Sequence, residues 1–136
     1  MKHLKKFNES HTVKQESSPK IIYLNDLTDG EIEVIETCND ILLDIKDDGF
    51  EISVHNGNYF DDVTKNYHHD IFILIEKGNF FVSDINDTKR RLESYLNNIG
   101  YYPRDKDIED NEKLHHNSYN DCCALLLCFS KISKAR

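Results

Sequence analysis

The sequence predicts an α+β fold of two layers, in which two helices cover one face of an antiparallel sheet. Apolar residues recur at helical spacing in two segments, about 31–48 and 84–99. Runs that are apolar or alternate with polar residues, as in strands, flank both segments. The elements therefore follow in the order β-α-β-β-α-β, which predicts a ferredoxin-like sandwich. A length of 136 residues allows one such domain.

The first twenty residues differ in composition from the rest of the chain. Residues 1–20 are polar and carry five lysines against two glutamates, and they end in Ser17-Ser18-Pro19. We expect a mobile basic tail here and a single domain over 21–136. The apolar run 21–24 is the predicted first strand of that domain.

The segment 31–48 is predicted to be the first helix, because its apolar residues fall on one side of a 3.6-residue period. These residues are Ile32, Ile35, Cys38, Ile41, Leu42 and Ile45. Acidic residues in the first turn suit the positive end of the helix dipole. Gly49 follows the helix at a position where a left-handed conformation often ends it.

Two strands are predicted between the helices. Residues 50–54 alternate apolar and polar side chains, and the following His55-Asn56-Gly57-Asn58 has the composition of a turn. Residues 71–75 are uninterrupted apolar, which is typical of a central strand. Residues 58–69 have no clear pattern.

The second half of the domain repeats the helix and strand signals. Ser83 is the predicted N-cap of the helix 84–99, which Gly100 closes. Residues 101–121 form a long acidic loop, which we expect to be a mobile excursion. The final strand, 124–132, is apolar on both sides. It should therefore be central in the sheet, or the sheet should be covered by the loops, the tail or another copy of the chain.

The charge distribution is uneven along the chain. The net charge is −8, but residues 1–20 and 131–136 are each +3, so that the middle is strongly acidic. On the first helix, five carboxylates recur at spacings of three and four and form one acidic stripe: Glu33, Glu36, Asp40, Asp44 and Asp47. Such a stripe suits a basic partner or mimics the phosphates of DNA. The alternative is a solvated surface that keeps the protein soluble.

Several classes of function have no support in the sequence. Phosphate-binding glycine loops and the G-x-S-x-G motif of hydrolases do not occur. The pairs His68-His69 and His115-His116, and the cysteines Cys38, Cys122, Cys123 and Cys128, lack the spacing of a structural zinc site. We therefore expect no catalytic residues, no metal and no cofactor, with thiols that stay reduced in a cytoplasmic protein. The acidic composition argues against nucleic-acid binding, and no run is long enough to span a membrane.

The N-terminal sequence MKHLKKFNES resembles the short leader of tailed-phage proteins. In internal head proteins of the T-even type, such a leader directs the chain into the prohead, where a protease cuts after the glutamate. The matching positions here are Leu4, Phe7, Glu9 and Ser10. Phe7 departs from the usual Leu or Ile of the family. The body of the chain is similar to uncharacterised small phage proteins.

Together these features predict a small phage-encoded accessory protein that acts by binding another protein, not by catalysis. It would work in the host cytoplasm. Two alternatives remain open at this point: a virion component packaged in the head through the leader, and an acidic DNA mimic that inhibits a basic host protein. A small metal-dependent enzyme is the least favoured interpretation.

Overall fold

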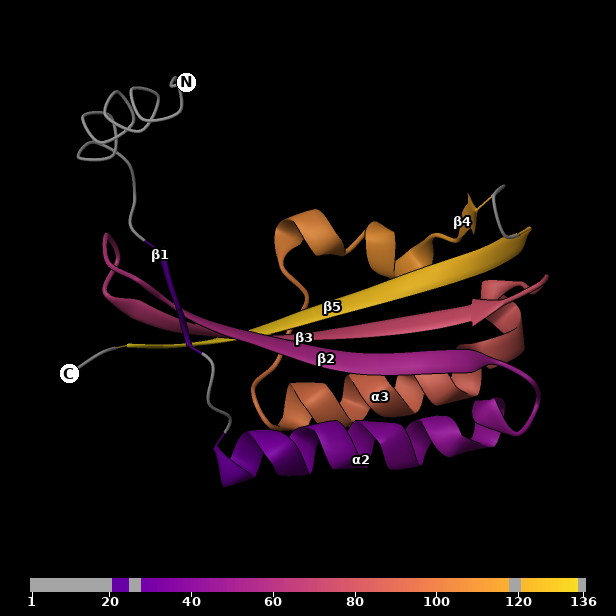
Figure 1. Ribbon diagram of the computed structural model, residues 1–136, viewed down its shortest axis with the longest axis horizontal. Helices are drawn as coiled ribbons and strands as arrows, with labels where there is room; N and C mark the ends of the chain where they lie inside the picture. Colours follow the sequence, from indigo (N-terminus) through magenta and orange to yellow (C-terminus); the bar gives the residue numbers. More distant parts are fainter. Residues whose placement is uncertain (1–20, 25–27, 118–120, 135–136) are drawn as a thin grey trace, which may run out of the picture.

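The computed structural model describes residues 21–24, 28–117 and 121–134. A single sheet lies above two α-helices (Figure 1). The elements are β1 (Ile21–Leu24), α2 (Asp29–Lys46), β2 (Glu51–Asp61), β3 (Asn66–Lys77), the 3-10 helix η2 (Val82–Ile85), α3 (Asn86–Asn98), the 3-10 helices η3 (Asp105–Asp107) and η4 (Asp110–Glu112), β4 (His115–Asn117) and β5 (Cys122–Lys134). The predicted leader and basic tail, residues 1–20, lie outside the described residues.

The sheet has the strand order β1-β2-β3-β5-β4, and every neighbouring pair is antiparallel. The prediction of an α+β fold with an antiparallel sheet is therefore confirmed. The ferredoxin-like arrangement is not found. A split βαβ unit needs two parallel strands joined through a helix, whereas here β1 lies at one edge and pairs only with β2.

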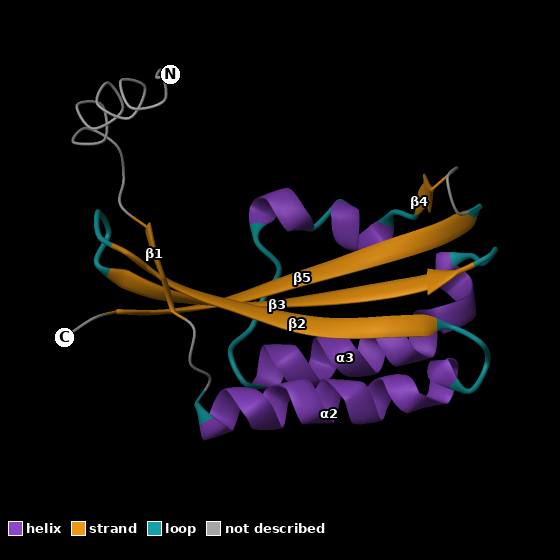
Figure 2. Cartoon of the chain, viewed as in Figure 1, coloured by secondary structure: helices purple, strands orange, loops and turns teal. Residues whose placement is uncertain are grey.

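Both α-helices cover the same face of the sheet, as predicted (Figure 2). The core between the layers is aliphatic and closely packed. Its fully buried side chains include Cys38 and Leu42 of α2, Leu92 and Leu96 of α3, Ile71, Ile73 and Ile75 of β3, and Leu125 and Leu127 of β5. Burial of this apolar surface, at about 25 cal/mol per Å², is what holds the helices on the sheet.

The helix α2 begins and ends as its sequence indicates. Thr28 and Glu31 form a capping box, in which each side chain accepts a hydrogen bond from the other residue's backbone N–H. Gly49 has a φ of +96°, the left-handed conformation that favours glycine after a helix. The apolar face differs from the prediction at its first turn, because Ile32 is exposed and Glu31 is buried.

The helix α3 begins later than predicted. Ser83 is not its N-cap, because residues 82–85 form the 3-10 helix η2 and α3 begins at Asn86. The hydrogen bond from the Phe81 N–H to Asp84 Oδ2, 2.9 Å long, supports this extra turn. The Asp84 carboxylate, three residues after Phe81, therefore caps the start of this turn in place of Ser83.

The predicted turn at Asn56-Gly57 is wrong. Both residues lie in the middle of β2, opposite Ile71 and Asp70 of β3. The reversal comes at residues 62–65 instead, where the Val63 N–H donates to Asp61 Oδ1 (2.9 Å) and Lys65 has a φ of 62°. Continuous cross-strand pairing outweighs the local turn preference of the Asn-Gly pair.

The acidic connection after α3 lies beside β5, on the side of that strand away from β3. Tyr102 forms two backbone hydrogen bonds with Ser130, of 2.9 and 2.8 Å. The Asn111 side chain then accepts from the Cys128 N–H (2.9 Å) and donates to its carbonyl oxygen (3.2 Å), as a neighbouring strand would. This part of the predicted excursion is therefore packed against the sheet, and β5 is an inner strand.

Candidate functional site

The five predicted carboxylates are all exposed: Glu33, Glu36, Asp40 and Asp44 of α2, and Asp47, which is the C-cap of the helix. They lie on the side of the helix opposite Cys38 and Leu42, which face the sheet. We call this surface the acidic face. Its exposure follows from the helical period, because the acidic residues recur every three or four positions on one side and the apolar residues do so on the other.

The acidic face has little local neutralisation. Among the described residues, Asp44 is its only member in an ion pair, with its Oδ2 atom 2.5 Å from Arg91 Nη2 of α3. Both of these side chains are exposed, so the pair adds little to stability. The remaining carboxylates face solvent and are available to a basic partner.

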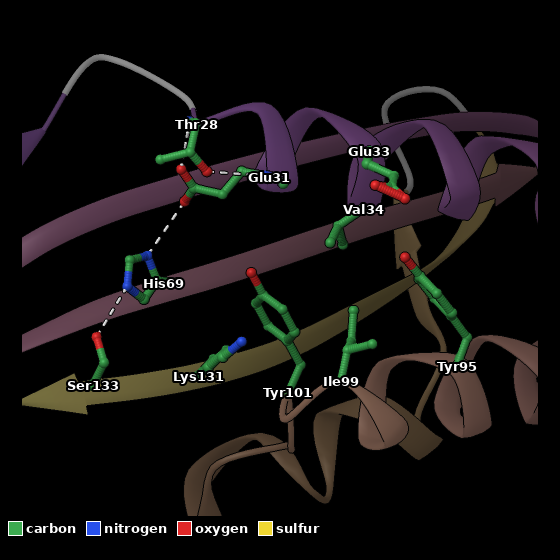
Figure 3. A pocket seen from close by; sticks show the side chains of 11 residues that line it. Thr28, Glu31, Glu33, Val34, His69, Tyr95, Ile99, Tyr101, Lys131 and Ser133 are labelled. Carbon is green, nitrogen blue, oxygen red and sulfur yellow. Dashed lines mark hydrogen bonds and ion pairs between the residues drawn. The ribbon is translucent and has the colours of Figure 1, made fainter.

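A second candidate site is a pocket between the N-terminal end of α2, the end of α3 and the sheet (Figure 3). Its volume is about 470 Å³, within the range of small-molecule sites. The lining residues are Thr28, Gly30, Glu31, Glu33 and Val34 from α2 and its cap, His69 from β3, Tyr95, Ile99 and Tyr101 from α3 and the segment after it, and Lys131 and Ser133 from β5. We call it the α2–β5 pocket.

Glu31 is the buried acid of this pocket, with 9% of its side chain exposed. Its Oε1 atom accepts from the Thr28 N–H (2.9 Å). Its Oε2 atom accepts from the side-chain amide of Asn58, a buried residue of β2. A buried carboxylate needs such donors because it has given up its hydration.

The pKa of Glu31 reflects this environment. Burial by itself raises the pKa, but the hydrogen bonds from Thr28, Asn58 and His69 outweigh it. The pKa therefore lies below its usual value of 4.5, so that the group is ionised at neutral pH.

His69 lies between Glu31 and Ser133. Its Nδ1 atom lies 3.3 Å from Glu31 Oε2, and its Nε2 atom lies 3.4 Å from the hydroxyl oxygen of Ser133. An ionised carboxylate only accepts, so it selects the His69 tautomer with the proton on Nδ1. The Nε2 atom is then the acceptor that faces the Ser133 hydroxyl.

The sheet register brings these residues together. His69 is directly opposite Asn58 of β2 and Lys131 of β5. Ser133 is two residues after Lys131 and so points to the same face. That face carries α2, which places Glu31 above His69.

The remaining wall of the pocket combines apolar and polar groups. Val34 and Ile99 are aliphatic, while Tyr95 and Tyr101 present rings with hydroxyl groups (Figure 3). Burial, followed by the nearby charge of Glu31, raises the pKa of Tyr101 to about 12. The Lys131 ammonium lies 5.6 Å from the centre of the Tyr101 ring, a cation–π distance.

The other titratable residues that the sequence singled out are dispersed. His68 points to the opposite face of the sheet from His69 and stacks on Tyr59, with ring centres 4.6 Å apart. In the described part of the chain, no three His, Cys, Asp or Glu side chains converge as metal ligands would. Cys38 and Cys128 are buried and Cys122 and Cys123 are partly exposed; all four are free. The leader residues Leu4, Phe7, Glu9 and Ser10 lie outside the described residues.

Comparison with known proteins gives no relative from which a function can be carried over. No family model matches the chain, and no curated protein or solved structure is significantly similar to it. In the described residues, none of the helices is both long and apolar enough to cross a bilayer.

The sequence predicted the acidic face but missed the α2–β5 pocket. One signal was present: Glu31 falls on the same side of the helical period as Val34 and Cys38, where an acid needs buried partners. Its partner His69 is 38 residues further along the chain, and Ser133, which contacts His69, is 102 residues further along. Without the sheet register, no local pattern connects them.

Proposed function

We propose that the protein acts by binding a basic protein partner through the acidic face of α2. The observation that carries the proposal is the exposure of all five carboxylates on one side of α2 and its C-cap. A helical backbone is already ordered before binding, so the spacing of the charges does not have to be fixed when the partner binds. The row of like charges also accelerates encounter with a positively charged surface.

The neighbourhood of the acidic face supports a protein as the partner. Ile32 and Leu43 of α2 are 41% and 49% exposed. Exposed aliphatic side chains beside a charged row provide apolar contact area in addition to charge. A protein surface with lysines or arginines around an apolar patch has the complementary chemistry.

The test is a double charge reversal, Glu36→Lys with Asp40→Lys. These two residues are exposed, and neither forms an ion pair within the described residues, so the fold should be unaffected. Asp44 is left unchanged because its reversal would place a lysine beside Arg91. The matched control reverses two exposed acids of the connection after α3, Asp105→Lys with Glu109→Lys, which changes the net charge equally.

The three proteins are used as bait in extracts of infected cells, and the captured proteins are quantified by mass spectrometry. We expect a basic protein that the wild type and the control both capture, that the Glu36/Asp40 variant loses, and that 0.5 M salt releases. Duplex DNA would compete if that partner is a DNA-binding protein, as DNA mimicry requires. Identical captured sets for all three baits would overturn the proposal.

A second candidate is packaging in the phage head, which the leader sequence favours. The residues that favour it are Leu4, Phe7, Glu9 and Ser10. Intact-mass analysis of purified virions should then detect a chain that begins at Ser10. Virions without this protein, or with only the full-length chain, would contradict the packaging hypothesis.

A further inference from the structure

We propose that Ser133 in the α2–β5 pocket is an activated nucleophile that reacts with small acyl esters, with His69 as its general base and Glu31 as a positioning residue. This activity is separate from the binding proposed for the acidic face. It rests on the hydrogen-bonded series that joins the buried Glu31 carboxylate through His69 to the exposed Ser133 hydroxyl (Figure 3).

The order of the three groups suits nucleophilic catalysis. A serine hydroxyl is a weak nucleophile unless an adjacent base removes its proton, and that base must itself be oriented by a third group. His69 Nε2 lies 3.4 Å from the Ser133 hydroxyl, and Nδ1 lies 3.3 Å from Glu31 Oε2. Such hydrogen bonds are often long in free enzymes and shorten when substrate binds.

Exposure increases in the same order. The Glu31 side chain is 9% exposed and the His69 side chain 24% exposed, while Ser133 is exposed to solvent. The acid is thus held by Thr28 and Asn58, away from bulk water, while the hydroxyl is accessible to a reactant.

The pocket also has the chemistry to receive an ester. Val34 and Ile99, with the ring of Tyr95, form an apolar wall for a short acyl chain. Lys131 is the only lysine or arginine among the described residues that line the pocket. Its positive charge would favour the oxyanion that develops during acyl transfer.

The proposed reaction balances without any further reagent. Ser133 Oγ bonds to the carbonyl carbon while its proton passes to His69 Nε2, and the carbonyl π electrons move to the oxygen. The oxyanion collapses, the bond to the alcohol breaks, and the alcohol takes the proton from Nε2. Water then attacks the acyl-serine with His69 as base. The carboxylic acid leaves, and Ser133 recovers its proton.

The first experiment measures reaction of the intact protein with a fluorophosphonate probe, located by peptide mass spectrometry. We expect modification of Ser133 and not of Ser83, which is exposed but has no histidine partner among the described residues. Ser133→Ala should abolish the labelling, and His69→Gln should slow it by about 100-fold or more. Labelling of Ser133 no faster than of Ser83 would overturn the proposal.

The second experiment tests Glu31 as a positioning residue. Glu31→Gln keeps an oxygen for the Thr28 cap but removes the negative charge that selects the His69 tautomer, so labelling of Ser133 should slow at least about tenfold. Asn111→Ala, which perturbs the edge of β5 away from the pocket, serves as a destabilised control with unchanged labelling. p-Nitrophenyl butyrate hydrolysis should follow the same ranking. Equal rates for wild type, Glu31→Gln and His69→Gln would refute the inference.

Discussion

Glu31 and Glu33 are two positions apart on α2, yet Glu31 belongs to a buried, hydrogen-bonded region and Glu33 to a hydrated surface. Glu31 is buried in the α2–β5 pocket and accepts hydrogen bonds from Thr28, Asn58 and His69. Glu33 is exposed on the acidic face, at the rim of the same pocket. A rotation of about 200° around the helix separates them. The environment, not the residue type, therefore decides whether a carboxylate organises the interior or only contributes charge to the surface.

The difference shows where electrostatics is strong and where it is weak in this protein. A buried carboxylate interacts with its donors at a low effective dielectric, and these donors lose the acceptor that the described residues provide when it is removed. An exposed carboxylate is hydrated and screened by salt. Stability should therefore depend on Glu31, while the acidic face should matter for association.

The largest expected effect is that of Glu31→Ala. Removing this carboxylate leaves the buried Asn58 amide and the Thr28 N–H without their acceptor, so the free energy of unfolding should fall by about 2–3 kcal/mol. Glu33→Ala should change it by less than about 0.5 kcal/mol. Urea denaturation of the two variants provides the measurement, and equal effects would contradict the contrast between them.

The second prediction concerns pH. The pKa of Glu31 is lower in the folded protein than its usual value of 4.5, so its charge stabilises the fold above that value. This contribution is lost as the pH falls through the lower folded-state pKa. The stability difference between wild type and Glu31→Gln should accordingly be largest near neutral pH and shrink below about pH 4.5. Denaturation midpoints between pH 7 and 3 test this, and a constant difference would refute it.

The smallest effect is expected for Asp44→Ala on the acidic face. The ion pair of Asp44 with Arg91 joins side chains that are 69% and 50% exposed, so its loss should cost no more than about 0.5 kcal/mol. That small cost should disappear in 0.5 M salt. Asp40→Ala, which breaks no ion pair among the described residues, is the matched control. A salt-independent loss above 1 kcal/mol would show that the acidic face also has a structural role.

The sequence by itself determined the features that depend on residues close in the chain. The apolar periods located both helices and, apart from the first turn of α2, the face that this helix presents to the sheet. The acidic face followed from the same period. The three isoleucines of β3 were recognisable as core because a continuous apolar run is stable only when covered. A local turn preference was nevertheless overridden by strand pairing at Asn56-Gly57, which lies in the middle of β2.

Only the tertiary structure decided the strand order and the composition of the α2–β5 pocket. β1 pairs with β2 at the sheet edge, a choice that a four-residue apolar run does not encode. His69 meets Ser133, 64 residues later, because β3 and β5 share one register. Glu31 meets His69 because α2 packs on that face of the sheet. Such contacts depend on how elements distant in sequence align, and a shift of one residue would send every side chain of a strand to the other face.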